Sequence, residues 1–235
     1  MSALAVSVIF LTGCVWLRLL AMRDQFKEFD THFFIERPNG GLVLGCRDPV
    51  IRGEDISWMV TGPPTRRRDD GLIWTWLFRK EPIPGETTDL LSRELALAVG
   101  LKNDLVEKVI FPDPVLKVVP AEVVIAMMRA LGTATIDQEK RTALAIMRQP
   151  TQRLSIPTRE QLLRWFGKAH LSERDKGVET LTFRYRLVAA EGVVTEETTG
   201  PPLVTVSFRF ASDSNKPRRF SANLGGNWIS MELPR

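Results

Sequence analysis

Residues 54–80 read EDISWMVTGPPTRRRDDGLIWTWLFRK, and residues 160–186 read EQLLRWFGKAHLSERDKGVETLTFRYR. Both stretches have the same order: a short amphipathic segment ended by a glycine, a polar loop, and an alternating apolar strand. The glycines are Gly62 and Gly167, and glycine readily takes the left-handed conformation that closes a helix. The chain therefore carries an internal repeat, in which equivalent residues lie about 105–109 positions apart.

The alternating residues of the repeat predict strands that bury one face. The apolar trios are Trp74, Trp76 and Phe78 in the first copy, and Leu181, Phe183 and Tyr185 in the second. A period of two places each trio on one face of a sheet, and we predict that the tryptophans face the core. Two more alternating segments follow in each copy, at 95–101 and 105–111 and at 204–210 and 218–223. Each unit is thus predicted as a helix followed by three antiparallel strands.

The rest of the chain supplies further helices and a hairpin. Apolar residues at helical spacing predict helices over 15–30, 120–131 and 137–149, and the turn 38–41 predicts a hairpin. We therefore predict an α+β fold of two tandem units, each with helices packed on a three-stranded antiparallel sheet. The predicted domains are a signal peptide at 1–13, a first unit at 14–115 and a second unit at 116–235, with the proline-bracketed stretch 110–120 at the boundary.

Composition limits the possible classes of protein. The 235 residues are 44% hydrophobic and 26% charged, which is typical of a globular chain. A mean hydropathy of −0.06 excludes a protein with several membrane spans. Two cysteines and two histidines argue against a disulfide scaffold and a metal centre, and no cofactor is expected.

The N-terminal segment resembles the signal peptide of a bacterial lipoprotein. Residues 1–17 carry no charged side chain, a run somewhat short for a membrane span. Within it, Leu11, Thr12, Gly13 and Cys14 form a lipobox: small residues precede the cleavage site, and the cysteine thiol accepts diacylglycerol. We predict that acylated Cys14 holds the protein on a bilayer, and Val15 favours the outer membrane, facing the periplasm. An uncleaved anchor and an ordinary buried helix are the alternatives.

The second copy of the repeat resembles the SmpA/OmlA-type small outer-membrane lipoproteins, which are accessory lipoproteins of the β-barrel assembly machinery. The residues that carry this resemblance are Glu160-Gln161-Leu162-Leu163, Gly167, and Phe183 with Tyr185. The resemblance implies a helix pair on a three-stranded antiparallel sheet, a shape shared with β-lactamase-inhibitor-like domains. It also implies a role in outer-membrane assembly or maintenance with an envelope protein partner. The first copy departs from the pattern at Gly62-Pro63-Pro64.

Two basic clusters accompany a net charge of +4. They consist of Arg66, Arg67 and Arg68 and of Lys216, Arg218 and Arg219. Arginine matches phosphate and carboxylate groups, so the clusters predict contact with anionic lipid or lipopolysaccharide. The alternative is a pair of solvated loops balanced by neighbouring aspartates. Nucleic acid is not an expected partner, because the aromatic residues alternate within strands instead of interleaving with exposed basic residues.

No catalytic fingerprint is present in the sequence. Cys46 with His32 or His170, and the pair Asp69 and Asp70, are the only candidates for catalysis, and each is simpler to explain as a structural or turn residue. We therefore expect no enzyme, but a membrane-anchored envelope lipoprotein that acts as a non-catalytic protein-interaction or scaffold module. One alternative is a soluble inhibitor-like or ligand-binding module with a buried N-terminal helix. The other is a hydrolase that uses Cys46 or the aspartate pair on an unknown substrate.

Overall fold

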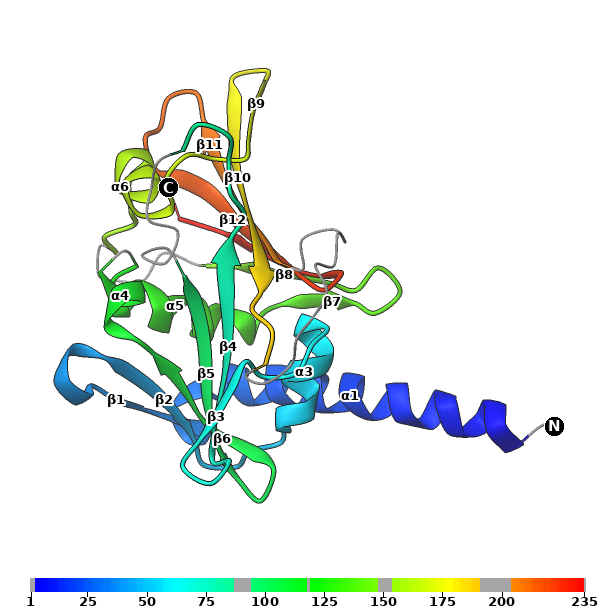
Figure 1. The fold of residues 1–235 in the computed structure, drawn as a ribbon. Helices are drawn as coiled ribbons and strands as arrows, with labels where there is room; N and C mark the ends of the chain where they lie inside the picture. The colour runs from blue at the N-terminus through cyan, green and yellow to red at the C-terminus, as the bar shows by residue number, and fades with distance from the viewer. Residues whose placement is uncertain (1–2, 87–93, 118, 148–153, 191–203, 235) are drawn as a thin grey trace.

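The computed structural model describes residues 3–86, 94–117, 119–147, 154–190 and 204–234 (Figure 1). The helices are α1 (Ala3–Lys27), α2 (Phe29–His32), α3 (Gly53–Val60), α4 (Asp113–Leu116), α5 (Ala121–Leu131) and α6 (Arg159–Phe166), with a 3-10 turn at Pro38–Gly40. The strands are β1 (Phe33–Glu36), β2 (Leu42–Cys46), β3 (Arg66–Arg68), β4 (Ile73–Lys80), β5 (Leu95–Lys102), β6 (Leu105–Phe111), β7 (Thr135–Asp137), β8 (Thr142–Ile146), β9 (Leu171–Asp175), β10 (Val178–Leu187), β11 (Val204–Ala211), β12 (Pro217–Leu224) and β13 (Asn227–Glu232).

The described strands form one 13-stranded sheet in the order β1-β2-β6-β5-β4-β10-β11-β12-β13-β8-β7, with β3 beside β4 and β9 beside β10. Neighbouring strands are antiparallel except β13 and β8, which are parallel. The predicted fold of two separate units, each with helices on a three-stranded sheet, is therefore wrong: the described strands join in one large mixed sheet with few helices. The physical reason is that each predicted trio leaves unpaired backbone groups at its edges, and these edges pair with other strands.

The two copies of the repeat join where β4 and β10 meet at their C-terminal ends. The paired residues are Lys80 with Tyr185, Arg79 with Arg186, and Phe78 with Leu187. Arg79 follows Phe78, the last member of the first apolar trio, and Arg186 follows Tyr185, the last member of the second. The two arginines lie opposite each other in the register of the strands. The junction therefore has approximate two-fold symmetry about the Arg79–Arg186 pair.

Thr65 and His170 occupy equivalent positions on the two sides of this junction. The Thr65 Oγ1 accepts the Leu77 N–H (3.1 Å) and donates to the Val188 carbonyl oxygen (2.8 Å). The His170 ring accepts the Arg184 N–H at Nδ1 (3.1 Å), and its Nε2 donates to the Glu81 carbonyl oxygen (3.0 Å). Each side chain thus forms hydrogen bonds with backbone groups of both β4 and β10, or of the residues that directly follow these strands, near their junction.

A buried ion pair also links the two copies. Lys80 lies in the core with its side chain fully buried, and its Nζ bonds to Glu86 at 2.9 Å. The same Nζ donates to the Lys168 carbonyl oxygen at 2.7 Å, which connects β4 to the loop after α6. Because a buried ammonium needs several partners, these contacts fix the loop against the junction.

The longer helices pack on the same face of the sheet. The main core contains Ile56, Val60, Trp76, Phe78, Leu162, Phe166, Leu181, Phe183, Tyr185, Val204, Val206, Phe208 and Phe210. Leu19 and Met22 of α1 lie against this core, and α5 covers β8 and β13 through a second cluster around Ala145 and Met231. Trp76 is 0% exposed and donates its indole N–H to the Gly62 carbonyl oxygen, so the prediction that it faces the core is confirmed.

Most local predictions are confirmed, and the others are corrected as follows. Helices occupy 15–27, 29–32 and 121–131, and the hairpin around 38–41 is present. The predicted helix over 137–149 is wrong, because 142–146 forms β8 beside β13, and residues 148 and 149 lie outside the described residues. The left-handed residue after α3 is Thr61, not Gly62, whereas Gly167 takes a positive φ after α6. The polar loops contain the short strands β3 and β9.

Candidate functional site

In the second half of the chain, the face of the sheet opposite the helices carries hydroxyl side chains on adjacent strands. The residues that alternate with the buried ones on β10–β13 are Thr180, Thr182, Thr205, Ser207, Ser221 and Ser230. The hydroxyls of Thr182 and Ser207 lie 3.1 Å apart, and those of Ser221 and Ser230 lie 2.9 Å apart. Among the described residues, none of these six belongs to a hydrophobic core cluster. We call this surface the open face.

Arginines add positive charge to the open face. Arg186 pairs with Glu81 at 2.6 Å, and Arg219 pairs with Glu232. Arg184 and Arg209 are exposed on the same face, and within the described part of the chain neither makes an ion pair. Arg209 lies opposite Arg219 in the register of β11 and β12. The open face therefore offers unneutralised guanidinium groups, which suit carboxylates.

The two predicted basic clusters lie far from each other. Arg66, Arg67 and Arg68 form β3, all three are exposed, and the Arg67 guanidinium lies 4.5 Å from the Trp74 ring centroid. Lys216 directly precedes β12, and Arg218 and Arg219 lie near the start of that strand. Because β4 and β10 meet only at their C-terminal ends, the clusters are separated by on the order of 45 Å along the strands.

The predicted lipobox lies in the N-terminal half of α1, which extends away from the body in Figure 1. The side chains of Leu11, Thr12, Gly13 and Cys14 lie outside the described part of the structure. Four residues later, Arg18 donates to the Asp55 carboxylate of α3 (2.7 Å for Nε–Oδ2). Asp55 is only 1% exposed and also accepts the Arg52 backbone N–H at the start of α3. In the described residues, no helix is both long and apolar enough to cross a membrane.

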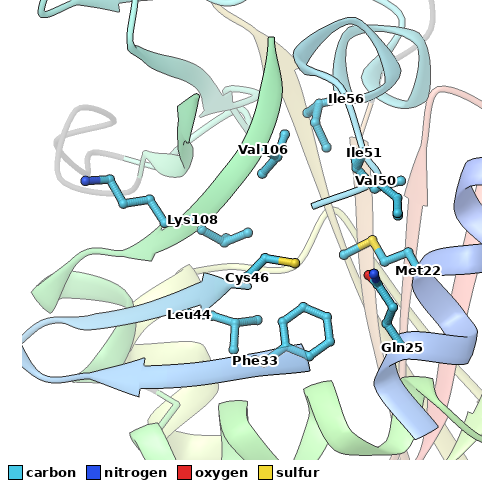
Figure 2. A pocket seen from close by; sticks show the side chains of 11 residues that line it. Met22, Gln25, Phe33, Leu44, Cys46, Val50, Ile51, Ile56, Val106 and Lys108 are labelled. Atoms are coloured by element: carbon cyan, nitrogen blue, oxygen red, sulfur yellow. The ribbon is translucent and has the colours of Figure 1, made fainter. Parts of the chain in front are cut away.

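Cys46 borders a small cavity between α1, β1–β2 and β6. The lining includes Met22, Phe33, Leu44, Cys46, Val50, Ile51, Ile56, Val106 and Val109. The Cys46 and Met22 sulfur atoms point toward the same space in Figure 2. Its volume of about 50 Å³ is far below that of a pocket for a drug-sized ligand. Burial raises the pKa of the Cys46 thiol, so the unreactive protonated form dominates at neutral pH.

The structure does not assemble the other catalytic candidates into a site. Within the described residues, the Cys46 thiol makes no hydrogen bond to either imidazole: His32 pairs with Asp48 at 3.0 Å, and His170 lies in the β4–β10 junction. Asp69 and Asp70 are exposed and take positive φ values, which identifies them as turn residues. No group of three His, Cys, Asp or Glu side chains in the described ranges could hold a metal ion.

The sequence reasoning missed the open face. The signal was present in 180–186 and 205–209, where threonine, serine and arginine alternate with the apolar residues. Such alternation is typical of a sheet with one buried and one solvated face.

Comparisons with protein-family models, with curated proteins and with solved structures find nothing that matches this chain. The resemblance to the SmpA/OmlA-type lipoproteins therefore depends on the quoted motifs alone.

Proposed function

We propose that the protein is a membrane-anchored envelope lipoprotein that acts without catalysis as a protein-interaction module. In this proposal the lipobox is cleaved before Cys14, acylated Cys14 enters the outer membrane from the periplasmic side, and the open face binds an acidic surface of a protein partner. The role is in the assembly or maintenance of the outer membrane. Arg66–Arg68 and Lys216 with Arg218 supply further positive charge for anionic lipid or lipopolysaccharide.

The observation that carries the proposal is the division of the molecule into a covered and an open side. The helices pack on one face, whereas the other presents hydroxyls and two arginines without a carboxylate partner among the described residues. A surface built on hydrogen-bonded strands loses little conformational entropy when it binds, and its excess positive charge selects an acidic partner.

The anchored arrangement is supported by the packing of α1. Leu19, Met22 and Phe26 belong to or lie against the core, and Arg18 ties the helix to Asp55. A helix that is fixed from residue 18 onward holds the body close to whatever surface residue 14 enters. The same packing also suits the alternative of a soluble module with a buried helix, so the test must separate membrane attachment from partner binding.

The test is affinity capture from bacterial envelope membranes with the full chain. The matched variants are the double substitution Arg184→Glu with Arg209→Glu, and the double substitution Arg174→Glu with Lys176→Glu in the exposed β9–β10 hairpin as a control of the same charge change. We expect the double variant to lose an acidic partner that the wild type and the control both retain, and higher salt to weaken the wild-type complex. Equal recovery by all three proteins would contradict binding at the open face.

Membrane attachment is read separately in the same preparations. A Cys14→Ala variant is expected to keep residues 1–13 and to carry no lipid at residue 14, with its open face unchanged. Retention of processed protein in the membrane fraction after this substitution would contradict the lipid anchor.

A further inference from the structure

Three segments meet at the point where α1 leaves the body. The Trp16 ring of α1 and the Trp58 ring of α3 are 5.7 Å apart, edge to face at 80°. The Arg141 guanidinium, in the β7–β8 loop, lies 5.6 Å from the Trp58 ring centroid. We call Trp16, Leu17, Trp58 and Arg141 the exit cluster.

The exit cluster and its surroundings expose an unusual amount of apolar surface. Leu17 is 66% exposed, and Trp16 and Trp58 are only partly buried. Trp228 is 41% exposed and donates its backbone N–H to the Arg141 carbonyl oxygen (2.8 Å). Exposed apolar side chains that gather in one region of a protein commonly mark a surface that contacts something else.

The position of the exit cluster in the chain indicates what covers it. The cluster follows directly on a segment, residues 1–17, without a charged side chain. Trp16 lies two residues after Cys14, which at helical rise is about 3 Å along the axis of α1. Because Arg18 and Asp55 fix α1 against α3, the body cannot turn this cluster away from a bilayer that residue 14 enters.

We infer that the exit cluster rests in the headgroup region of the bilayer. The inference depends on the proposed anchoring through Cys14. Tryptophan is enriched at membrane–water interfaces because its ring is apolar while its N–H seeks a polar partner. Leu17 adds apolar contact, and the Arg141 guanidinium binds lipid phosphate oxygens. The occupant is the surface of a bilayer that contains anionic phospholipids, and the open face stays free for a partner.

The test uses the full chain reconstituted with vesicles of zwitterionic and anionic phospholipids that carry bromine on the acyl chains. Flotation measures anchoring, and bromine quenching of tryptophan fluorescence measures contact with the bilayer. The matched variants are the double substitution Trp16→Phe with Trp58→Phe, and Trp165→Phe in α6 as a control. We expect wild-type fluorescence to be quenched and the double variant to lose at least about half of that quenching, whereas the control retains it.

The two readouts separate the possible failures. Flotation of the protein without bromine quenching, or quenching that the double variant retains in full, would overturn the bilayer contact while the anchor stands. Failure to float would instead remove the proposed anchor and this inference together.

Discussion

The His170 side chain makes the stability of the β4–β10 junction depend on pH. Its Nδ1 accepts the Arg184 N–H, so the ring must be neutral to complete both of its hydrogen bonds. Burial lowers the pKa of His170 most, and the nearby charges of Lys80 and Arg184 lower it further. The hydrogen bond to the Glu81 carbonyl and the Glu81 carboxylate act in the opposite direction.

The sign follows from proton linkage. Since the folded pKa lies below the unfolded value of about 6.5, the unfolded chain binds a proton first as the pH falls, and the free energy of unfolding decreases. A single histidine can contribute at most about 1.4 kcal/mol per pH unit in that window. His170 is partly exposed, and solvent screening reduces the expected loss to about 0.5–1 kcal/mol between about pH 7.5 and pH 5.5.

The assay is urea unfolding of the full chain at both pH values, followed by tryptophan fluorescence. His170→Gln provides an amide that can donate and accept but does not titrate, and His32→Gln is the matched control. We expect His170→Gln to flatten the pH dependence by the stated amount, while His32→Gln keeps the wild-type slope. An unchanged slope in His170→Gln would refute the role of the neutral imidazole.

Three other substitutions and one deletion test the packing. Asp55→Ala removes the Arg18 contact and the acceptor for the Arg52 N–H, and is expected to lower the free energy of unfolding by about 2–4 kcal/mol; a loss under about 1 kcal/mol in urea titration would speak against the link between α1 and α3. Phe166→Ala, which opens space beside Phe183 and Phe208, should lower the free energy of unfolding by about 3–5 kcal/mol. Val60→Ala, at the corresponding position of α3, removes a smaller side chain and should cost about 1–3 kcal/mol; the reverse order in denaturant titrations would contradict the packing described for the two helices. Removal of residues 1–14 should change Tm by less than about 2 °C in calorimetry, and a drop above about 5 °C would favour a buried N-terminal helix.

The local structure could be predicted because its signals lie close together in the sequence. Alternating apolar residues identified β4, β5, β10 and β11, and polar two-residue turns such as Asn103-Asp104 marked the hairpins, with positive φ at both positions. The helix around Leu19 and Phe26 followed from spacing alone. These signals act within a few residues, where backbone sterics and burial of one face decide the conformation.

The arrangement of the sheet could not be predicted in the same way. The pairing of Arg79 with Arg186, and of Ile229 with Ala143, joins strands that are far apart in the chain, and no local pattern encodes it. The segment Thr142–Ile146 has apolar residues on both faces, so helical and strand spacing fit it equally well. Its pairing with β7 and β13 decides for a strand. The open face became recognisable once the side of the sheet covered by helices was known.

The mass of the mature chain tests the central claim most directly. Protein extracted from bacterial envelopes should begin at residue 14, with a mass increase that corresponds to a diacylglyceryl group and an acyl chain on Cys14. A chain that keeps residues 1–13 ahead of an unmodified Cys14 would contradict the account.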